Sequence, residues 1–382
     1  MPHTSRPHAS PTTPRPRIGI DARKLGDFGI GEYLAQLIDE LALLEPWCDF
    51  VLLHQLEAPP PLPAHMTWRR NDAGKYSLRE QVALPWQSWR ERLSLLHLPH
   101  YVVPLWSPCP LVVTVHDVIH LRFAAQLSLA ARAYARFMIG HAARSARHII
   151  TVSEHSRDDL VALAGADPAK ITVVHNGITR DAQPMHPVQA RAAVRELLGW
   201  DGPFLLTVAN TRMPHKNLPR LVEAFARAAG EVDAGLRLVI VGGEPPAALQ
   251  QAVARSLGPR AEQVVFPGYL ERAGLLALYN ACRAFVWPSL YEGFGFPPLE
   301  AMACGSPVVS SAASVMPEVL GEAAHYFNPT DPADMARAIR EVLTDAGLRD
   351  RLVQRGTRQA AQFTWAEAAR KTAAVYRDVL GL

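Results

Sequence analysis

Two glutamates, Glu292 and Glu300, lie in the segment SLYEGFGFPPLEAMACGSPVV. A strand is predicted to end before Glu292, and a helix to begin at the paired prolines, because proline suits the first helical position. The free N–H groups of such a helix start attract an anion, while Gly293 and Gly295 let the backbone approach a ligand. Carboxylates beside an anion site are expected to bind hydroxyls, such as those of a sugar or a ribose. The alternative, a turn with one solvated and one capping glutamate, explains each residue but not their combination.

A second candidate segment, TVANTRMPHKNLPRLVEAF, places Arg212 and Lys216 in a loop between a predicted strand at 204–210 and a helix. Cations at the carboxyl end of a strand are expected to face a diphosphate and to stabilise a departing nucleotide. The alternative is a pair of solvated surface cations, which is usual for loop residues. The position at the strand end favours the functional interpretation.

A glycine loop with Gly29 and Gly31 follows a predicted strand at 17–21 and precedes a helix from about Glu32. The start of this helix would favour phosphate. A dinucleotide fingerprint requires GxGxxG directly after the strand, and here the loop is longer and the third glycine is missing. A nicotinamide cofactor is therefore not expected. A simple turn explains Gly29 equally well, whereas ligand binding is favoured for Gly31.

The apolar run at 111–118 carries His116 and Asp117 at its end. A polar pair there is poorly placed for burial unless it lines a cleft. His116 is predicted to hydrogen-bond a sugar hydroxyl and Asp117 to orient it, the alternative being a structural histidine. Asn176, in VVHNGI, is interpreted as part of a structural turn with a possible donor contact.

These loops need a scaffold that brings them to one edge. Short β-rich runs alternate with helical patterns along the whole chain, which predicts parallel sheets covered by helices. The aperiodic segment 177–187, with two prolines, is interpreted as an interdomain linker. The fold class is therefore α/β, with two Rossmann-like, doubly wound domains facing a cleft, the default ligand site. The expected divisions are a disordered tail at 1–16, domains at 17–187 and 188–363, and a last helix at about 364–382 that packs back on the first domain.

The E-x7-E spacing of Glu292 and Glu300 in EGFGFPPLEAMACGSPVV resembles the signature of the group 1, family 4 retaining glycosyltransferases. Several other segments match in order from Arg17 onward. The resemblance implies the GT-B fold, with Glu292 contacting the donor sugar and Glu300 the ribose. It also implies a diphosphate-binding lysine at Lys216.

The remaining roles come from the same resemblance. The family's arginine position falls on Thr211, with Arg212 one step along, so Arg212 ranks below Lys216. The predicted catalytic residues are Glu292, Lys216, His116 and Arg212. The predicted donor-binding residues are Gly29, Gly31, Glu300, Gly293, Phe294, Gly295, Asp117 and Asn176.

The resemblance further implies transfer of a hexose with retention, by front-face attack with the leaving phosphate as base. GDP-mannose is preferred as donor because the KNL loop is similar to that of mannosyltransferase-like members, and UDP-sugars remain open. The acceptor is expected to be a saccharide or lipid-linked saccharide of bacterial surface polysaccharide synthesis. No metal is required, since no DxD-type ligand motif occurs. The alternatives are an epimerase of the same fold and a non-catalytic nucleotide-binding assembly protein.

Length and composition limit the number of domains and the kinds of partner. The 382 residues suit two domains, and the net charge of +3 gives no argument for nucleic acid. The four cysteines form no CxxC pair, which indicates buried thiols in a reducing cytosol. No segment is long and apolar enough to span a bilayer, so membrane contact, if any, is peripheral. The basic helix predicted at 129–148 either faces lipid head groups through Arg132, Arg136, Arg144 and Arg147 or is a solvated face.

Overall fold

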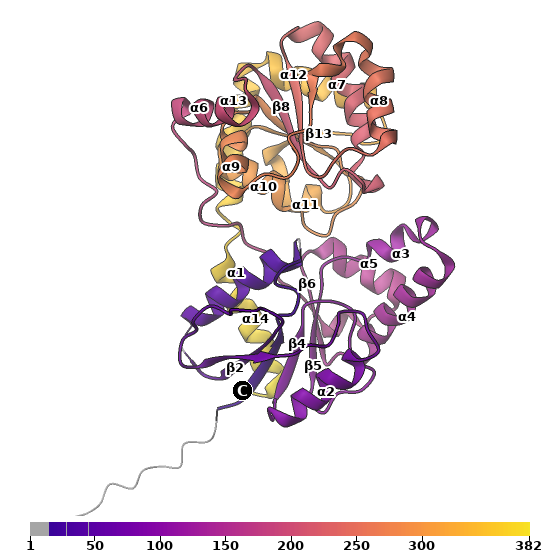
Figure 1. Cartoon of the computed structure of the whole chain (residues 1–382), viewed down its shortest axis with the longest axis vertical. Helices are drawn as coiled ribbons and strands as arrows, with labels where there is room; N and C mark the ends of the chain where they lie inside the picture. Colours follow the sequence, from indigo (N-terminus) through magenta and orange to yellow (C-terminus); the bar gives the residue numbers. More distant parts are fainter. Residues whose placement is uncertain (1–14, 28, 45) are drawn as a thin grey trace, which may run out of the picture.

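The chain folds into two α/β units, one above the other in Figure 1. The computed structural model describes residues 15–27, 29–44 and 46–382. Most of the predicted tail at 1–16 lies outside the described residues. Each unit contains one parallel sheet between helices, which confirms the predicted fold class.

The N-terminal sheet has seven strands in the order β3-β2-β1-β4-β5-β6-β7. All of its strand pairs are parallel, and the order reverses between β1 and β4. Its strands are β1 (Arg17–Asp21), β2 (Asp49–His54), β3 (Met66–Arg70), β4 (Leu95–Leu98), β5 (Leu111–Val115), β6 (His148–Thr151) and β7 (Ile171–Val173).

The C-terminal sheet has six strands in the order β10-β9-β8-β11-β12-β13, again all parallel. The order reverses between β8 and β11, and in open α/β sheets such a switch point opens the crevice that binds ligands. Its strands are β8 (Phe204–Val208), β9 (Arg237–Val241), β10 (Val264–Val265), β11 (Ala284–Trp287), β12 (Val308–Ser311) and β13 (Ala324–Phe327).

Helices cover both faces of each sheet, because the strands are buried on both sides and present apolar residues to both. Those of the first unit are α1 (Ile30–Leu43), α2 (Glu80–Arg90), α3 (Ile119–Arg122), α4 (Leu129–Ser145) and α5 (Glu154–Ala164). Those that follow are α6 (Pro187–Leu198), α7 (Leu218–Val232), α8 (Ala247–Leu257), α9 (Arg272–Ala281), α10 (Phe296–Ala303), α11 (Met316–Leu320), α12 (Pro332–Thr344), α13 (Ala346–Ala360) and α14 (Trp365–Leu380).

The last helix, α14, leaves the C-terminal unit and packs beside α1 on the N-terminal sheet, drawn in yellow in Figure 1. Its apolar residues Trp365, Ala369 and Tyr376 join the core formed by β1 and α1. At its start, Gly177 of the linker contacts the Trp365 backbone so closely that a Cβ would overlap it. The two units are thus tied together by both chain crossings.

Candidate active site

Lys216 and Glu292 meet at the switch point of the C-terminal sheet. Lys216 follows β8 in a short 3-10 turn, and Glu292 follows β11, the neighbouring strand. The Nζ of Lys216 lies 2.6 Å from the Oε1 of Glu292, and the two side chains are 17% and 13% exposed. The ammonium also lies 5.0 Å from the ring centroid of Trp287, at the end of β11. The two loops therefore present one half-buried ion pair at the place where an open α/β sheet binds ligands.

Two residues that the sequence interpretation missed fix these loops. Asn217 has a left-handed φ of 59°, and its side-chain amide donates to the carbonyl of Pro288 at 3.0 Å and to that of Pro329 at 2.7 Å. Ser314 donates to the Glu292 carbonyl at 2.9 Å and accepts from its amide at 3.2 Å. The signal for Asn217 was present in the sequence, because asparagine tolerates the left-handed region at a helix start.

His116 belongs to the N-terminal unit, and its carbonyl oxygen lies against Gly293, the residue after Glu292. Burial lowers the pKa of His116 to about 4, against a hydrogen bond from the imidazole to the Pro99 carbonyl that favours the charged form, so the imidazole is neutral near pH 7. Its ring packs edge-on against Tyr33 with centroids 4.7 Å apart. Its buried Nε2 has no hydrogen-bond partner among the residues that the structure describes. An unpartnered buried nitrogen is costly, and a ligand hydroxyl would satisfy it.

Asp117 lies beside His116 and turns back on its own chain. Its Oδ1 accepts from the amide of Ile119 at 2.9 Å. Burial raises the pKa of Asp117, and the charges of Glu292 and Lys216 both act on it. The carboxylate is therefore within electrostatic reach of the ion pair of the other unit.

The loop after Glu292 is shaped by contacts within the protein. A Cβ at Gly293 would overlap the carbonyl oxygen of His116, so glycine lets the two units touch. Gly295 has a φ of 95°, and a Cβ there would crowd the side chain of Met316. The ring of Phe294 is buried against Phe296 and Phe363, so a donor contact at this residue would come from its backbone.

Helix α10 begins directly after Gly295, one residue earlier than predicted. No side chain caps it. Pro297 and Pro298 lack N–H groups, so Gly295 and Phe296 supply the free amides at the start of the helix. The helix start retains donors for an anion, though fewer than an ordinary first turn offers.

Glu300 lies on α10 and is engaged by residues that the sequence interpretation missed. It is 9% exposed, accepts from the Tyr279 hydroxyl at 3.1 Å, and forms an ion pair with Arg272. Arg272 also binds both oxygens of Asp181 in the linker, at 2.8 and 3.0 Å. The hydrogen bond from Arg272 lowers the pKa of Asp181 to about 2, whereas burial raises that of Glu300. The linker and α10 are thus coupled through one guanidinium.

The glycine loop closes the N-terminal side. Gly29 caps α1 with a φ of 69°, and a Cβ at Gly31 would overlap the carbonyl of Leu25, so both glycines have a backbone reason. The same loop carries Lys24, which was not among the predicted residues. Its ammonium is 2.7 Å from the hydroxyl of Tyr76, and its charge lowers the pKa of His116. A cation between the end of β1 and the two glycines was the available signal.

Two predicted residues are not joined to this group. Arg212 is exposed, and only its backbone is held, by Asn210 at 3.1 Å. Thr211 is buried, and its hydroxyl donates to the carbonyls of Gly243 and Glu244. Asn176 is buried at the end of the N-terminal unit, and its Oδ1 lacks a partner among the described residues.

The units also meet at the start of α5. Glu318 of α11 accepts from the amides of Glu154 and His155 at 2.8 and 3.0 Å and from the Nε2 of His175 at 2.9 Å. Burial alone would raise the pKa of Glu318, but these hydrogen bonds outweigh it and lower the pKa. Ser153 caps α5 and also donates to the Gly293 carbonyl at 2.8 Å.

Each unit matches a model of a glycosyltransferase family. Residues 191–359 match the model of the group 1 glycosyl transferases, and residues 29–182 match that of glycosyltransferase family 4. O-antigen chain mannosyltransferase B of Escherichia coli is 34% identical over 236 residues, 61% of each chain. The serotype-specific mannosyltransferase WbdA of Escherichia coli is 38% identical over 168 residues, 44% of this chain but 20% of that protein. The chain therefore spans less than two thirds of the length of these relatives.

Solved structures show the same arrangement of two units. Sucrose-phosphate synthase from Thermosynechococcus elongatus superposes with a TM-score of 0.76 at 21% identity, over 96% of this chain and 100% of that chain. Anabaena HepE in complex with UDP-glucose gives a TM-score of 0.74 at 18% identity, over 95% of this chain and 99% of that chain. At these identities the likeness concerns the fold.

Proposed function

Because this chain belongs to the group 1 and family 4 glycosyltransferases and has their GT-B fold, we propose that it transfers a hexose, with retention, from a nucleoside-diphosphate sugar. The observation that carries this proposal is the Lys216–Glu292 pair, 2.6 Å apart at the switch point of the C-terminal sheet. Gly293, the residue after Glu292, contacts the carbonyl of His116 in the other unit, and the imidazole of His116 is neutral.

The first role of this group is to stabilise the leaving nucleotide. As the glycosidic bond breaks, negative charge grows on the diphosphate, and Lys216 and the amides at the start of α10 are oriented before that charge appears. Donor phosphates would draw the ammonium partly away from Glu292, which frees a carboxylate oxygen for a sugar hydroxyl. Glu300 is proposed to bind the ribose, and Arg212 to add long-range attraction from its exposed position.

Retention is proposed to follow from front-face attack, with the leaving phosphate accepting the acceptor's proton. The support is the state of the nearby carboxylates. Glu292 is held by Lys216, and the Oδ1 of Asp117 accepts from the Ile119 amide, so neither is presented as a free nucleophile. His116 would hydrogen-bond a sugar hydroxyl through Nε2, with no metal required for any of these roles.

The donor and acceptor are proposed from the relatives. The mannosyltransferases named above favour GDP-mannose, and the UDP-glucose complex of HepE keeps UDP-sugars as second candidates. The acceptor is proposed to be a saccharide or lipid-linked saccharide of surface polysaccharide synthesis, which would bring the enzyme to the inner face of the cell membrane.

The test begins with thermal unfolding of the full chain against a panel of nucleoside diphosphates, where the base that binds raises the midpoint. Incubation of the matching nucleotide-sugar with a saccharide acceptor, followed by NMR of the new anomeric centre, then checks retention. Chelator in a parallel reaction checks that no metal is required. Isomerised donor without acceptor would identify an epimerase, and nucleotide binding without turnover a non-catalytic protein.

A further inference from the structure

Helix α2 carries an apolar stripe on its outer surface. Val82, Trp86 and Trp89 recur at i, i+4 and i+7 and are 70%, 53% and 68% exposed. Leu78, just before the helix, is also exposed. A helix packed on a sheet normally turns charged residues outward, so an aromatic stripe facing solvent requires a partner.

The segment 104–110 joins this stripe to helix α4. Gln81 of α2 accepts from the amide of Leu105 at 2.8 Å, and His141 of α4 lies 3.2 Å from the carbonyl of Pro104. Leu105 and the neighbouring Trp106 are 58% and 66% exposed, and Phe137 of α4, stacked on His141, is 54% exposed. We call residues 78–92 (with α2), 104–110 and 129–147 (with α4) together the α2–α4 face.

The α2–α4 face carries charge of one sign. Between Leu78 and Arg147 the chain has eight arginines, no lysine, and three carboxylates, Glu80, Glu91 and Asp117, none of which is exposed. Among the residues that the structure describes, six of the arginines make no ion pair: Arg79, Arg92, Arg132, Arg136, Arg144 and Arg147. Arginine binds phosphate bidentately, and tryptophan prefers the boundary between water and lipid.

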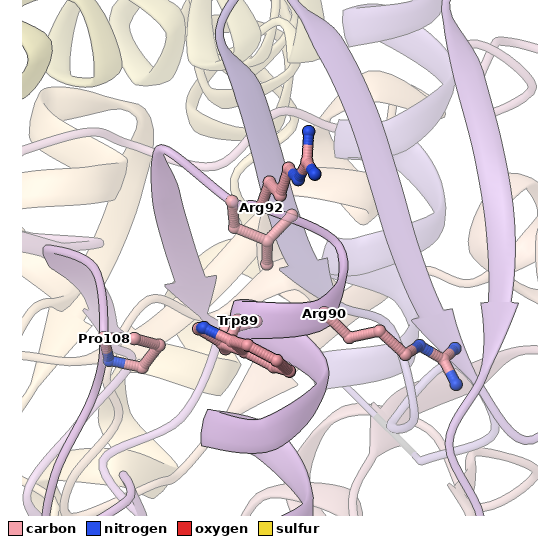
Figure 2. Close-up of a pocket in the computed structure, with 6 residues that line it drawn as sticks. Trp89, Arg90, Arg92 and Pro108 are labelled. Atoms are coloured by element: carbon pink, nitrogen blue, oxygen red, sulfur yellow. The ribbon is translucent and has the colours of Figure 1, made fainter.

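Two hollows of the face combine both residue types. One of about 550 Å³ is lined by Trp89, Arg90, Arg92 and Pro108, and Figure 2 shows the Trp89 ring between Pro108 and Arg90. A second of about 320 Å³ is lined by Trp106 and Arg147 among others. Each hollow offers an indole beside a guanidinium, the pairing expected where a phosphate head group meets an acyl chain.

We propose that the α2–α4 face docks on an anionic lipid bilayer, with the arginines on the phosphates and the tryptophans at the head-group boundary. No described helix is long and apolar enough to cross a membrane, so the contact is superficial. The uniform positive charge excludes a second copy of the same face as the occupant, because two such faces repel. The proposal goes beyond the transfer reaction and uses none of its residues.

The full chain is tested on vesicles of phosphatidylcholine alone and of phosphatidylcholine mixed with phosphatidylglycerol. We expect flotation with the mixed vesicles only, weakened by salt. The variant Arg132→Glu, Arg136→Glu, Arg144→Glu should lower the partition coefficient by roughly tenfold or more. The matched control is Arg191→Glu, Arg255→Glu, Arg358→Glu, which makes the same charge change on exposed arginines of α6, α8 and α13 and should bind as wild type.

Brominated lipids give a second, independent readout. They should quench the tryptophan fluorescence of the wild type. Quenching should be much weaker in the triple variant Trp86→Phe, Trp89→Phe, Trp106→Phe, because the other five tryptophans are not exposed. Equal binding of the two arginine variants, absence of quenching, or a self-association or nucleic-acid binding that replaces vesicle binding would each overturn the proposal. Donor hydrolysis should be equal in both arginine variants, so failure here is distinguishable from failure of the proposed transferase activity.

Discussion

The two sheets share the same order over six strands, with β7 added in the N-terminal one, but their carboxyl edges differ in charge. The C-terminal edge carries ion pairs, Lys216 with Glu292 and Arg272 with Glu300. The N-terminal edge also has a buried ion pair, Arg23 with Asp21, but it adds histidines that burial keeps neutral, with pKa values of about 3 for His97, about 2 for His100 and about 4 for His116. Fixed charges suit a charged leaving group, and neutral hydrogen-bonding groups suit sugar hydroxyls. The two units therefore differ in the electrostatics of their carboxyl edges rather than in topology.

The largest effect on activity is expected from removing the charges of the C-terminal edge. Lys216→Ala and Glu292→Ala are each expected to reduce the transfer rate by about 10²–10³-fold, because the developing diphosphate charge loses its preorganised partner or the sugar its carboxylate. The rate with saturating donor measures the effect, and circular dichroism checks the fold. Arg212→Ala, on an exposed neighbour, should change the rate by at most about fivefold. A wild-type rate in either of the first two variants would end the assignment of that residue.

Arg272→Ala tests whether the second ion pair holds the edge together. The substitution leaves Glu300 buried with Tyr279 alone, so the free energy of unfolding should fall by roughly 3 kcal/mol or more. Urea unfolding measures it. Arg195→Ala removes an exposed arginine paired with Asp201 and should cost about 0–1 kcal/mol. Equal losses in the two variants would show that Glu300 does not depend on the guanidinium.

The sequence predicted the C-terminal edge better than the N-terminal one for a physical reason. Glu292 and Lys216 each directly follow a predicted apolar strand, and parallel strands place their carboxyl ends together, so local pattern sufficed. The partners of Glu300 lie on other elements, and nothing in the spacing of Arg272 or Tyr279 points to α10. Strands β3, β4 and β13 were also missed, because each is short and shows no clear alternation.

The α2–α4 face shows the same limit. The basic residues of α4 were visible as a local pattern, but their combination with Trp86 and Trp106 depends on segment 104–110 running between two helices. Likewise, glycine at 293 was interpreted as space for a ligand, whereas the contact it permits is with the backbone of the other unit. Both features depend on contacts between segments that are distant in the sequence. The periodicity of a sequence predicts only local structure.

Acidification should destabilise the N-terminal unit more than the C-terminal unit. For a histidine whose folded pKa is lowered, the unfolded state takes up the proton first, so stability falls as pH decreases from about 6.5 toward the folded pKa. His97 and His116 should each contribute up to about 1.4 kcal/mol per pH unit over that window. Amide hydrogen exchange in β4 and β5 should therefore accelerate more than in β8 and β9. His97→Gln should flatten the dependence, and equal acceleration in both sheets would contradict the neutral edge.

The smallest expected effect concerns the contact that joins the two edges. Glu318→Gln keeps the shape of the side chain but removes the charge from the start of α5, which should cost about 1 kcal/mol at pH 7. Because the folded pKa of Glu318 is lowered, its contribution is present above the unfolded pKa and is lost as pH falls below about 4.5. The difference in unfolding free energy between wild type and variant should therefore shrink on acidification, and exchange of the Glu154 and His155 amides should be faster in the variant at pH 7.

Glu322→Gln, on an 89% exposed side chain nearby, is the matched control and should show neither effect. If the Glu318→Gln difference instead persisted unchanged below pH 4, the carboxylate would not be binding α5 as an anion. The junction would then depend on its other contacts, among them the hydrogen bonds of Ser153 to the Gly293 carbonyl and of the Tyr291 hydroxyl to Asp159. In that case the charge of Glu318 would not stabilise the junction, and the charged groups that the N-terminal unit brings to the site would be Lys24 and Asp117.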